Sequence, residues 1–508
     1  MVLLLLLNIV IRIPSIPHEK GYDSFFIHSL ANSVSSLGYA GWWTNWMSVF
    51  GLYPYSYASA VPFSLSGISQ TTGISMEITI LLFCVSLGIF SIFSSYVLGS
   101  IFYEDFISKY IFSILFSISA GTINLTTWEI TTRAQFLVFF TFLIYLLFKF
   151  FNSSKKYLPL YLTTVAFLLA THHYVYFALF FSIFILFTFL VFRFKPKKEI
   201  KFFSHLVSPD HLYIIALVST FIIPFIFSGD LGLITEGSRY QWIFSIIMIS
   251  IRNLGPMLPL SIGAIVYLSS KKSKTYKEWS LLICLFPVVL FAYDKTYGYI
   301  FTYIFLTIFC VQGLGNIIKN YSPNKKIVLI CLVLFLILNT SFSCFFAHWR
   351  VGMGGGYSEW YMREETYTTG KWIKQNLDPN STAIGNGYET GRMFSSYGGR
   401  PILYHSDITN YMNKLITLDE SKIKKNSVYS KEFYFDNPYI LTGVSTSDGV
   451  LKWALNFPIT DGRIKDFIKK NNFYYFYEDS VSYNTFVGSL PANKNRIYNS
   501  GRMRIWIL

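Results

Sequence analysis

The stretch MEITILLFCVSLGIFSIFSSYVLG, residues 76–99, decides the class of this protein. It carries one charged side chain, that of Glu77, in a run that is otherwise uncharged. A helix that crosses the hydrocarbon core of a bilayer, about 30 Å thick, needs about 20 such residues. We therefore predict a membrane-spanning helix here. Further apolar stretches predict additional spans, several of them short, at 1–13, 109–122, 134–151, 158–171, 174–193, 211–229, 256–270, 279–293, 299–318 and 327–347.

The overall composition also indicates a membrane protein. Of the 508 residues, 53% are hydrophobic and only 14% are charged, and the mean hydropathy is +0.43. A soluble chain carries about 25% charged residues, so a soluble globular protein is excluded. The cysteines lie in apolar runs without the spacing of a zinc site or a disulfide framework; they are Cys84, Cys284, Cys310, Cys331 and Cys344.

The distribution of basic residues predicts the orientation of the chain. In a soluble protein a net charge of +15 would suggest a nucleic-acid partner. Here most Lys and Arg residues between the predicted spans lie on one side, in the loops around 109, 149–156, 193–201, 271–277 and 319–326. Such loops remain in the cytoplasm. We therefore predict a multi-pass protein of the cell membrane with a cytoplasmic N-terminus, an extracytoplasmic C-terminal domain and no nucleic-acid partner.

Residues 348–508 follow the last predicted span and have the composition of a soluble α/β domain. Helical patterns alternate with strand patterns, as is typical of layered α/β domains. The predicted helices are 359–376, 389–397 and 464–470, and the predicted strands are 381–384, 401–404, 473–477 and 502–508. The predicted fold is a polytopic α-helical membrane domain of about eleven spans over residues 1–347, followed by an exported α/β domain over residues 348–508.

The long connection between the first two predicted spans, residues 14–75, distinguishes the outer face. Packed helices are usually joined by two to eight residues, and longer loops are usually functional. A helix is predicted over 26–37, with Gly38 as its stop. The predicted spans 109–122 and 158–171 would rise only about 21 Å. We therefore expect both to end below the outer surface and to leave a recess there.

Titratable residues gather around this predicted recess. Asp23 follows the first predicted span, Glu129 and Arg133 follow the third, and His172 and His173 follow the fifth. Further cations are predicted on the same face at Arg239, Arg252 and Lys295. Cations of this kind bind a lipid phosphate, and a carboxylate nearby can act as a general base.

Each of these residues also has an ordinary interpretation. Asp23 would be a solvated loop carboxylate, and Glu129 with Arg133 would form a surface ion pair of little energetic value. The two histidines would close a helix at the headgroup layer. Arg252 and Lys295 would extend to the phosphates of bulk lipid.

Two motifs resemble a known family. They are Lys20-Gly21-Tyr22-Asp23, soon after the first span, and Trp128-Glu129-Ile130-Thr131-Thr132-Arg133-Ala134-Gln135, which enters the fourth. Together with the long first outer loop they resemble the GT-C superfamily of polyprenyl-phosphate-dependent membrane glycosyltransferases. The resemblance implies a catalytic acidic residue at Asp23 and a second acidic position at Glu129.

The resemblance implies a reaction as well. A sugar or glycan would move from a polyprenyl (dolichyl) phosphate donor to an acceptor on the outer side, with inversion at the anomeric carbon. Arg133, Arg239, Arg252 and Lys295 would bind the donor phosphate, and His172 and His173 would contact the donor or a metal. A divalent cation, Mg²⁺ or Mn²⁺, would be held by Asp23 and Glu129. Membrane lipids would be further partners.

The C-terminal region resembles one branch more closely. Residues 369–379, 383–391 and 399–401 are similar to the stretch that opens the soluble domain of archaeal oligosaccharyltransferase catalytic subunits. This chain has Gly385-Asn386-Gly387-Tyr388-Glu389 where that family has a Trp-Trp-Asp-Tyr-Gly motif that recognises the acceptor sequon. It has Glu129 alone where that family has paired aspartates. The resemblance therefore implies an archaeal enzyme of protein glycosylation type and leaves the acceptor open as a glycan, a lipid or a protein.

A polytopic transporter or flippase of lipid-linked glycans is the alternative function. Transporters often contain repeated halves with broken helices at matching positions. The break at Gly255-Pro256 has no counterpart in the other half of the sequence. A surface-anchored binding module is a third interpretation, and it leaves the long first loop unexplained. The sequence thus favours an enzyme over a transporter, and a transporter over a binding module.

Overall fold

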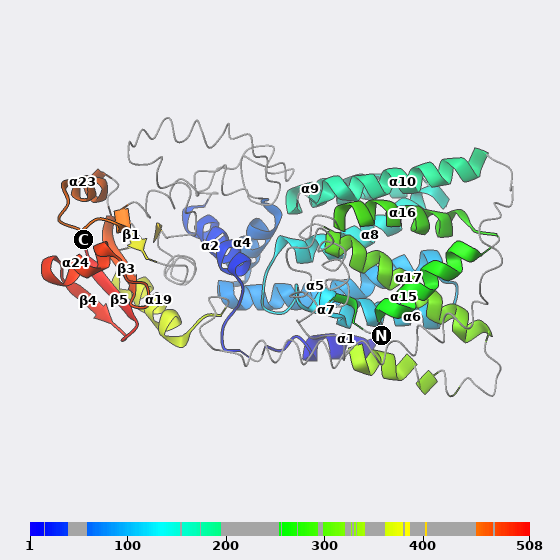
Figure 1. Cartoon of the computed structure of the whole chain (residues 1–508), viewed down its shortest axis with the longest axis horizontal. Helices are drawn as coiled ribbons and strands as arrows, with labels where there is room; N and C mark the ends of the chain where they lie inside the picture. The colour runs from blue at the N-terminus through cyan, green and yellow to red at the C-terminus, as the bar shows by residue number, and fades with distance from the viewer. Residues whose placement is uncertain are drawn as a thin grey trace, which may run out of the picture.

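The computed structural model places a helical bundle at one end of the molecule and a mixed sheet at the other (Figure 1). Helices α2 (Tyr22–Leu37) and α4 (Ala60–Thr72) lie between them. The structure describes residues 1–14, 16–38, 58–152, 155–172, 174–194, 253–255, 257–271, 273–292, 298–320, 327, 330–331, 333–340, 361–378, 381–386, 402–403, 454–470 and 473–508.

The bundle consists of apolar helices at most of the predicted spans. Its helices are α1 (Val2–Val10), α5 (Met76–Phe102), α6 (Phe106–Ile118), α7 (Ala120–Ile123), α8 (Thr132–Asn152), α9 (Tyr157–Thr171), α10 (Val175–Phe194), α15 (Met257–Ser270), α16 (Tyr276–Ala292) and α17 (Gly298–Asn320). By length and composition, α5, α8 and α10 can cross a membrane. The chain is therefore a membrane protein. The predicted span 211–229 lies outside the described residues.

Two predicted spans differ from the structure. The apolar start, 1–13, contains a helix of nine residues, α1, which rises only about 14 Å. The stretch 109–122 is divided at Ser119, whose extended backbone (φ −74°, ψ 159°) ends α6 before the single turn of α7 begins. Ser119 and Thr122 both contact the hydroxyl of Tyr303. The break between α6 and α7 is therefore held by a hydroxyl that belongs to α17, a helix far away in the sequence.

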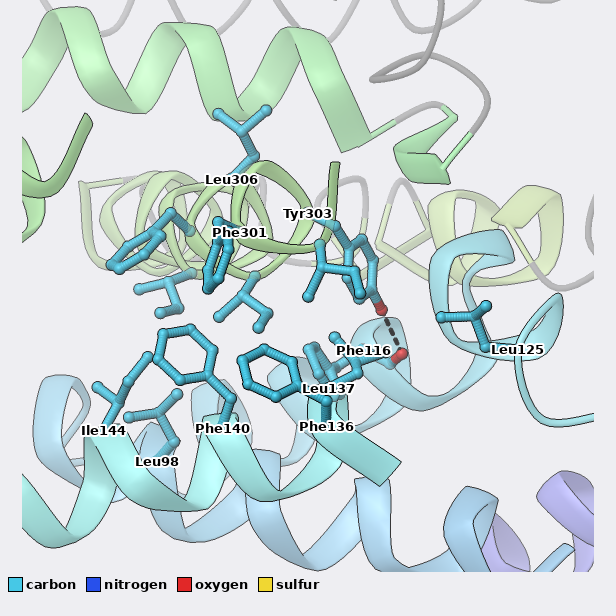
Figure 2. Close-up of a cluster of buried hydrophobic side chains, with 14 of the residues drawn as sticks. Leu98, Phe116, Leu125, Phe136, Leu137, Phe140, Ile144, Phe301, Tyr303 and Leu306 are labelled. Atoms are coloured by element: carbon cyan, nitrogen blue, oxygen red, sulfur yellow. Dashed lines mark hydrogen bonds between the residues drawn. The ribbon is translucent and has the colours of Figure 1, made fainter. Parts of the chain in front are cut away.

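The interior of the bundle is lined by aromatic rings (Figure 2). Phe136 and Phe140 of α8 stack with 5.5 Å between ring centroids, and Phe140 meets Phe301 of α17 edge-on at 5.1 Å. The Tyr303 hydroxyl donates to the carbonyl oxygen of Phe116 in α6 at 2.5 Å, the dashed line in Figure 2. These contacts fix α17 against α6 and α8, which positions the first turn of α17 beside the first turn of α8.

A buried arginine fastens α1 to the bundle. The guanidinium of Arg12 donates to Thr126 Oγ1 at 2.9 Å, to Asn8 Oδ1 at 2.7 Å and to the Ser117 carbonyl oxygen at 2.9 Å. Gly88 of α5 makes room for it, since a Cβ built on Gly88 would lie 2.2 Å from Arg12 Nε. Protein oxygens thus take the place of water around the buried guanidinium of Arg12.

Gly88→Ala should therefore destabilise the protein by about 1–3 kcal/mol, the usual effect of overpacking a filled interior. Alanine would normally stabilise a helix relative to glycine by about 1 kcal/mol. Gly67→Ala in α4 is the matched control, because a Cβ there meets nothing within 4 Å. Thermal unfolding in detergent should show a lower Tm for Gly88→Ala and an unchanged or higher Tm for Gly67→Ala. Equal Tm values for the two variants would contradict the packing of Arg12 against α5.

The C-terminal region is a layered α/β structure. Its sheet has the order β2-β1-β3-β5-β4, built from β1 (Thr382–Gly385), β2 (Ile402–Leu403), β3 (Phe473–Asp479), β4 (Arg496–Asn499) and β5 (Met503–Ile507). Strands β2, β1 and β3 are parallel, and β5 runs antiparallel to both β3 and β4. The helices are α19 (Glu364–Asn376), α23 (Gly462–Lys470) and α24 (Thr485–Asn493).

The two faces of the sheet are buried in separate apolar clusters. Ile384, Phe476 and Trp506 pack with α24 residues on one face, and Ala383 and Ile505 pack with α19 residues on the other. The four predicted strands and the predicted helices at 359–376 and 464–470 are confirmed, although the first of these helices begins only at Glu364. The sequence did not predict α24 or β4. The predicted helix 389–397 lies outside the described residues.

Candidate active site

Asp23 lies in the first turn of α2, directly after a tight turn at Gly21. Gly21 has a φ of +95°, which residues with side chains rarely adopt. The positive end of the helix dipole favours a carboxylate at this position. Nη2 of Arg133, in the first turn of α8, lies 3.9 Å from Oδ2 of Asp23, whose side chain is 44% exposed. Asp23 is thus close to a cation and still accessible to a reactant.

Glu129 precedes α8 and is buried. Its Oε2 atom lies 4.0 Å from Nζ of Lys20, which is buried as well. Burial lowers the pKa of Lys20, and the negative charge of Glu129 opposes that shift. The Glu129 side chain also rests on the backbone of Gly21, where an added Cβ would lie 2.7 Å from Cγ of Glu129. The missing side chain at Gly21 therefore lets the second carboxylate reach the turn that carries the first.

One backbone–backbone and one backbone–side-chain hydrogen bond join the start of α2 and the residues before it to the segment before α8. The Lys20 N–H donates to the Trp128 carbonyl oxygen at 3.1 Å, and the Ile130 N–H donates to Ser24 Oγ at 3.1 Å. Trp128 has a φ of +47°, and among the described residues it alone, glycine aside, has a positive φ. Its indole N–H donates to the Glu77 carbonyl oxygen at 3.3 Å. The structure thus brings together the two turns that carry Asp23 and Glu129.

Two tyrosines complete this group. Tyr299, one turn before Tyr303 in α17, forms a side-chain hydrogen bond with Arg133 and lies within electrostatic range of Asp23 and Glu129. Tyr361 pairs with Lys20 in an isolated antiparallel bridge. Burial, together with the charge of Glu129, raises the pKa of Tyr361 to about 12. Tyr361 is therefore a neutral hydrogen-bond donor at physiological pH, contributed by the segment that leads into α19.

His18 joins the same region to α5 and α19. Its Nδ1 lies 3.0 Å from Oε1 of Glu77, its Nε2 lies 3.1 Å from Oε2 of Glu364, and its ring stacks on Tyr367 with 3.7 Å between centroids. Burial disfavours the imidazolium, but the hydrogen bonds and charges of the two carboxylates outweigh burial and raise the pKa of His18. A protonated His18 can donate to both carboxylates at once. Lys371 adds a positive charge over the ring of Tyr367, with Nζ 4.3 Å from the ring centroid.

This contact predicts a pH-dependent stability. Because the pKa of His18 is raised above the ordinary 6.5, its stabilising effect is fully present below pH 6.5 and is lost as the pH rises through the raised value. His18→Gln should therefore have a lower Tm than the native protein near pH 6, and this difference should shrink toward pH 9. Thermal unfolding of both proteins between pH 6 and pH 9 tests this expected change in the Tm difference. A Tm difference that stays constant with pH would contradict a charged His18.

His172, predicted to contact the donor or a metal, is buried at the end of α9. Its Nδ1 accepts a hydrogen bond from the Tyr174 N–H at 3.2 Å, and its ring contacts Phe136 and Tyr174. With Nδ1 accepting this hydrogen bond, Nε2 is the ring nitrogen that carries a proton. His173 and the predicted phosphate ligands Arg239, Arg252 and Lys295 lie outside the described residues.

The described residues offer the predicted divalent cation two carboxylate ligands, those of Asp23 and Glu129. Each stands beside a positive side chain, Arg133 and Lys20 respectively. Within the part of the chain that the structure describes, no group of three or more His, Cys, Asp or Glu residues could hold a metal ion. A hard divalent cation usually takes six or more oxygen ligands, several of them waters for Mg²⁺.

Several members of the group were not predicted as site residues. Lys20 and Gly21 belong to the motif that contains Asp23. The one signal in the sequence for their role was the glycine itself, because glycine readily adopts the positive φ of a tight turn. Tyr299 and Tyr361 carried no signal in the sequence, because each arrives through a contact with a segment more than a hundred residues away. Among the residues that were predicted, Asp23, Glu129 and Arg133 lie together.

The arrangement suits the displacement of an anionic leaving group. Asp23 can accept a proton from a bound reactant, because its carboxylate is half-exposed. Arg133 can offset a negative charge that develops nearby, and Tyr299 holds its guanidinium. Tyr361 can donate a hydrogen bond next to Glu129.

Comparison with known proteins supports the fold. No protein-family model matches the sequence, and no curated protein sequence matches it. The solved oligosaccharyltransferase of Archaeoglobus fulgidus, tethered to an acceptor peptide that contains the NVT sequon, matches with a TM-score of 0.57 at 10% identity, over 94% of this chain and 69% of that chain. The oligosaccharyltransferase AglB from the same organism, in complex with an inhibitory peptide and a dolichol-phosphate, gives 0.56 at 10% identity, over 94% and 68%.

A third match is the arabinofuranosyltransferase AftD from Mycobacteria, with a TM-score of 0.54 at 11% identity. It covers 100% of this chain, which spans only 41% of that longer protein. These structures are GT-C glycosyltransferases, so the predicted resemblance to the GT-C superfamily is confirmed at the level of the fold. Identities of 10–11% support a shared fold only. The activity of this chain has to be inferred from its site.

Proposed function

We propose that this protein is a membrane glycosyltransferase. It moves a sugar or glycan from a polyprenyl (dolichyl) phosphate carrier to an acceptor on the outer face of the membrane. The observation that carries the proposal is the meeting of Asp23, Glu129 and Arg133 where α2 adjoins α8, within a GT-C fold. The half-exposed carboxylate can take the proton of the acceptor, and the guanidinium beside it can offset the charge of the leaving phosphate.

The proposed reaction is a single displacement. Asp23 accepts the proton of the acceptor nucleophile while that nucleophile attacks the anomeric carbon. The bond from this carbon to the phosphate oxygen breaks, and the lipid phosphate leaves with the electron pair. Arg133 offsets the charge that develops on the phosphate. Because the nucleophile enters opposite the leaving group, the configuration at the anomeric carbon is inverted.

The partners follow from this chemistry. The donor is a lipid-linked sugar phosphate, and the acceptor is a nucleophile on a glycan, a lipid or a protein. One structural neighbour is in complex with a dolichol-phosphate and another is tethered to an acceptor peptide, which supports a donor and an acceptor of these classes. Arg239, Arg252 and Lys295 remain proposed ligands of the donor phosphate. Residues 1–347 are proposed to form the membrane domain, with a cytoplasmic N-terminus, and residues 348–508 the domain outside.

Label transfer in membranes tests the proposal. Membranes that contain the native protein are supplied with a pool of polyprenyl phosphates that carry radiolabelled sugars. The label should move from the lipid fraction to a second glycan, lipid or protein fraction, and membranes without the protein should show no such movement. Equal label distributions in the two membranes would contradict the proposed activity.

A further inference from the structure

A buried Glu19–His28 pair adjoins the turn that leads to Asp23. Glu19 and His28 are 0% and 2% exposed, and Nδ1 of His28 lies 2.5 Å from Oε1 of Glu19. Neither residue takes part in the proposed displacement. Burying a carboxyl group costs free energy unless its oxygens have hydrogen-bond partners. The second oxygen of Glu19, Oε2, accepts a hydrogen bond from Ser24 Oγ at 3.1 Å.

Ser24 connects the Glu19–His28 pair to the site. A serine hydroxyl has one proton to donate and lone pairs with which to accept. The proton of Ser24 is committed to Glu19, so a lone pair is left for the Ile130 N–H, which donates to it at 3.1 Å. Ser24 follows Asp23 in the sequence, and Ile130 follows Glu129. One buried hydroxyl therefore links the two turns that carry the carboxylates.

We propose that Ser24 is a positioning residue of the transfer reaction, with the Glu19–His28 pair fixing the orientation of its hydroxyl. The proposal rests on the proposed function. Ser24 touches neither donor nor acceptor in this account and acts by holding Asp23 in register with Glu129 and Arg133. Displacement of a catalytic group by about 1 Å can lower a rate by about 100-fold. Loss of the Ser24 hydroxyl should therefore lower the rate of the chemical step more than it weakens donor binding.

Three variants test this role in the full-length protein. Ser24→Ala removes both hydrogen bonds, Ser24→Thr keeps the hydroxyl, and Ser35→Ala is the matched control. Ser35 lies on the same helix, and its hydroxyl contacts Ser66 of α4 at 2.9 Å, away from the site. With labelled polyprenyl-phosphate sugars as donor, kcat should fall by about 10- to 100-fold in Ser24→Ala, with a change in KM of less than about threefold. Ser24→Thr should recover most of kcat, and Ser35→Ala should keep the native value.

The Asp23→Asn background gives a second readout. If Ser24 acts through Asp23, Ser24→Ala should cause little further loss of kcat in Asp23→Asn. Should Ser24→Ala fail to accumulate, Ser24→Cys replaces it with the same expectation, because a thiol is only a weak hydrogen-bonding group.

The outcomes separate the two proposals. Native transfer with an unaffected Ser24→Ala, or an equal loss in Ser35→Ala, would overturn the positioning role and leave the proposed function in place. Full additivity of Ser24→Ala with Asp23→Asn would overturn it as well. No transfer by the native protein would overturn both proposals.

Discussion

Asp23→Asn should lower the rate of transfer by about 100- to 10,000-fold, the usual contribution of a general base. Asparagine has the size and shape of aspartate but cannot accept the proton of the acceptor nucleophile. The side chain is 44% exposed, and Arg133 is its one described charged partner within 4 Å. We therefore expect the folded state to be affected little, so that the loss appears in kcat and not in Tm.

The matched control for this variant is Asp466→Asn. Asp466 is an exposed carboxylate on α23, in the α/β region, and it undergoes the same chemical change. Transfer by Asp466→Asn should equal native transfer. Initial rates at saturating donor, with Tm measured in parallel, distinguish the two variants. If Asp23→Asn transferred sugar at the native rate, Asp23 would be the ordinary solvated carboxylate of the competing interpretation.

Gly21→Ala should abolish most of the transfer for a different reason. The backbone conformation at Gly21, with φ +95°, costs a residue with a side chain about 1–3 kcal/mol. The new methyl group would in addition lie 2.7 Å from Cγ of Glu129 and 2.9 Å from its Oε1, so the carboxylate must move. Glu129 and the turn before Asp23 are thereby displaced together. We expect a loss of at least about tenfold in transfer as well as a lower Tm.

Gly501→Ala is the control that separates backbone strain at a positive φ from the displacement of Glu129. Gly501 has nearly the same φ, +91°, in the turn between β4 and β5, and an added Cβ there meets nothing within 4 Å. Both variants should therefore lose stability, and only Gly21→Ala should lose transfer. If Gly501→Ala lost transfer to the same extent, the effect of Gly21→Ala would be one of general stability and not of Glu129.

The helices of the bundle could be predicted because each needs only an apolar run of sufficient length, as in α5 and α8. The interruption between α6 and α7 could not be predicted, because Tyr303 determines it through hydroxyl contacts with Ser119 and Thr122. The helix preceding Gly38 was predicted from its apolar face and confirmed as α2, with Gly38 at its left-handed end. Local patterns thus predicted the elements, and contacts distant in sequence determined their breaks.

The candidate site shows the same division. Asp23, Glu129 and Arg133 could be found because charged residues are scarce next to apolar runs, where they are costly and usually functional. Tyr361 reaches the site through a bridge to Lys20, and the whole bundle separates these two residues in the sequence. A single sequence gives no information on such a distant pairing. The role of Ser24 depends on the direction of one hydroxyl, which is set by buried Glu19.

The most direct test of the central claim is a measurement of what becomes of the lipid carrier. Purified native protein in lipid vesicles is given a labelled polyprenyl-phosphate sugar together with a mixture of glycan, lipid and peptide acceptors. Free polyprenyl phosphate and labelled acceptor are then quantified together. A glycosyltransferase should release both in equal molar amounts, with the anomeric configuration of the sugar inverted. If the label instead crossed the bilayer still attached to its lipid phosphate, with no free polyprenyl phosphate formed, the protein would be a transporter and our account would be wrong.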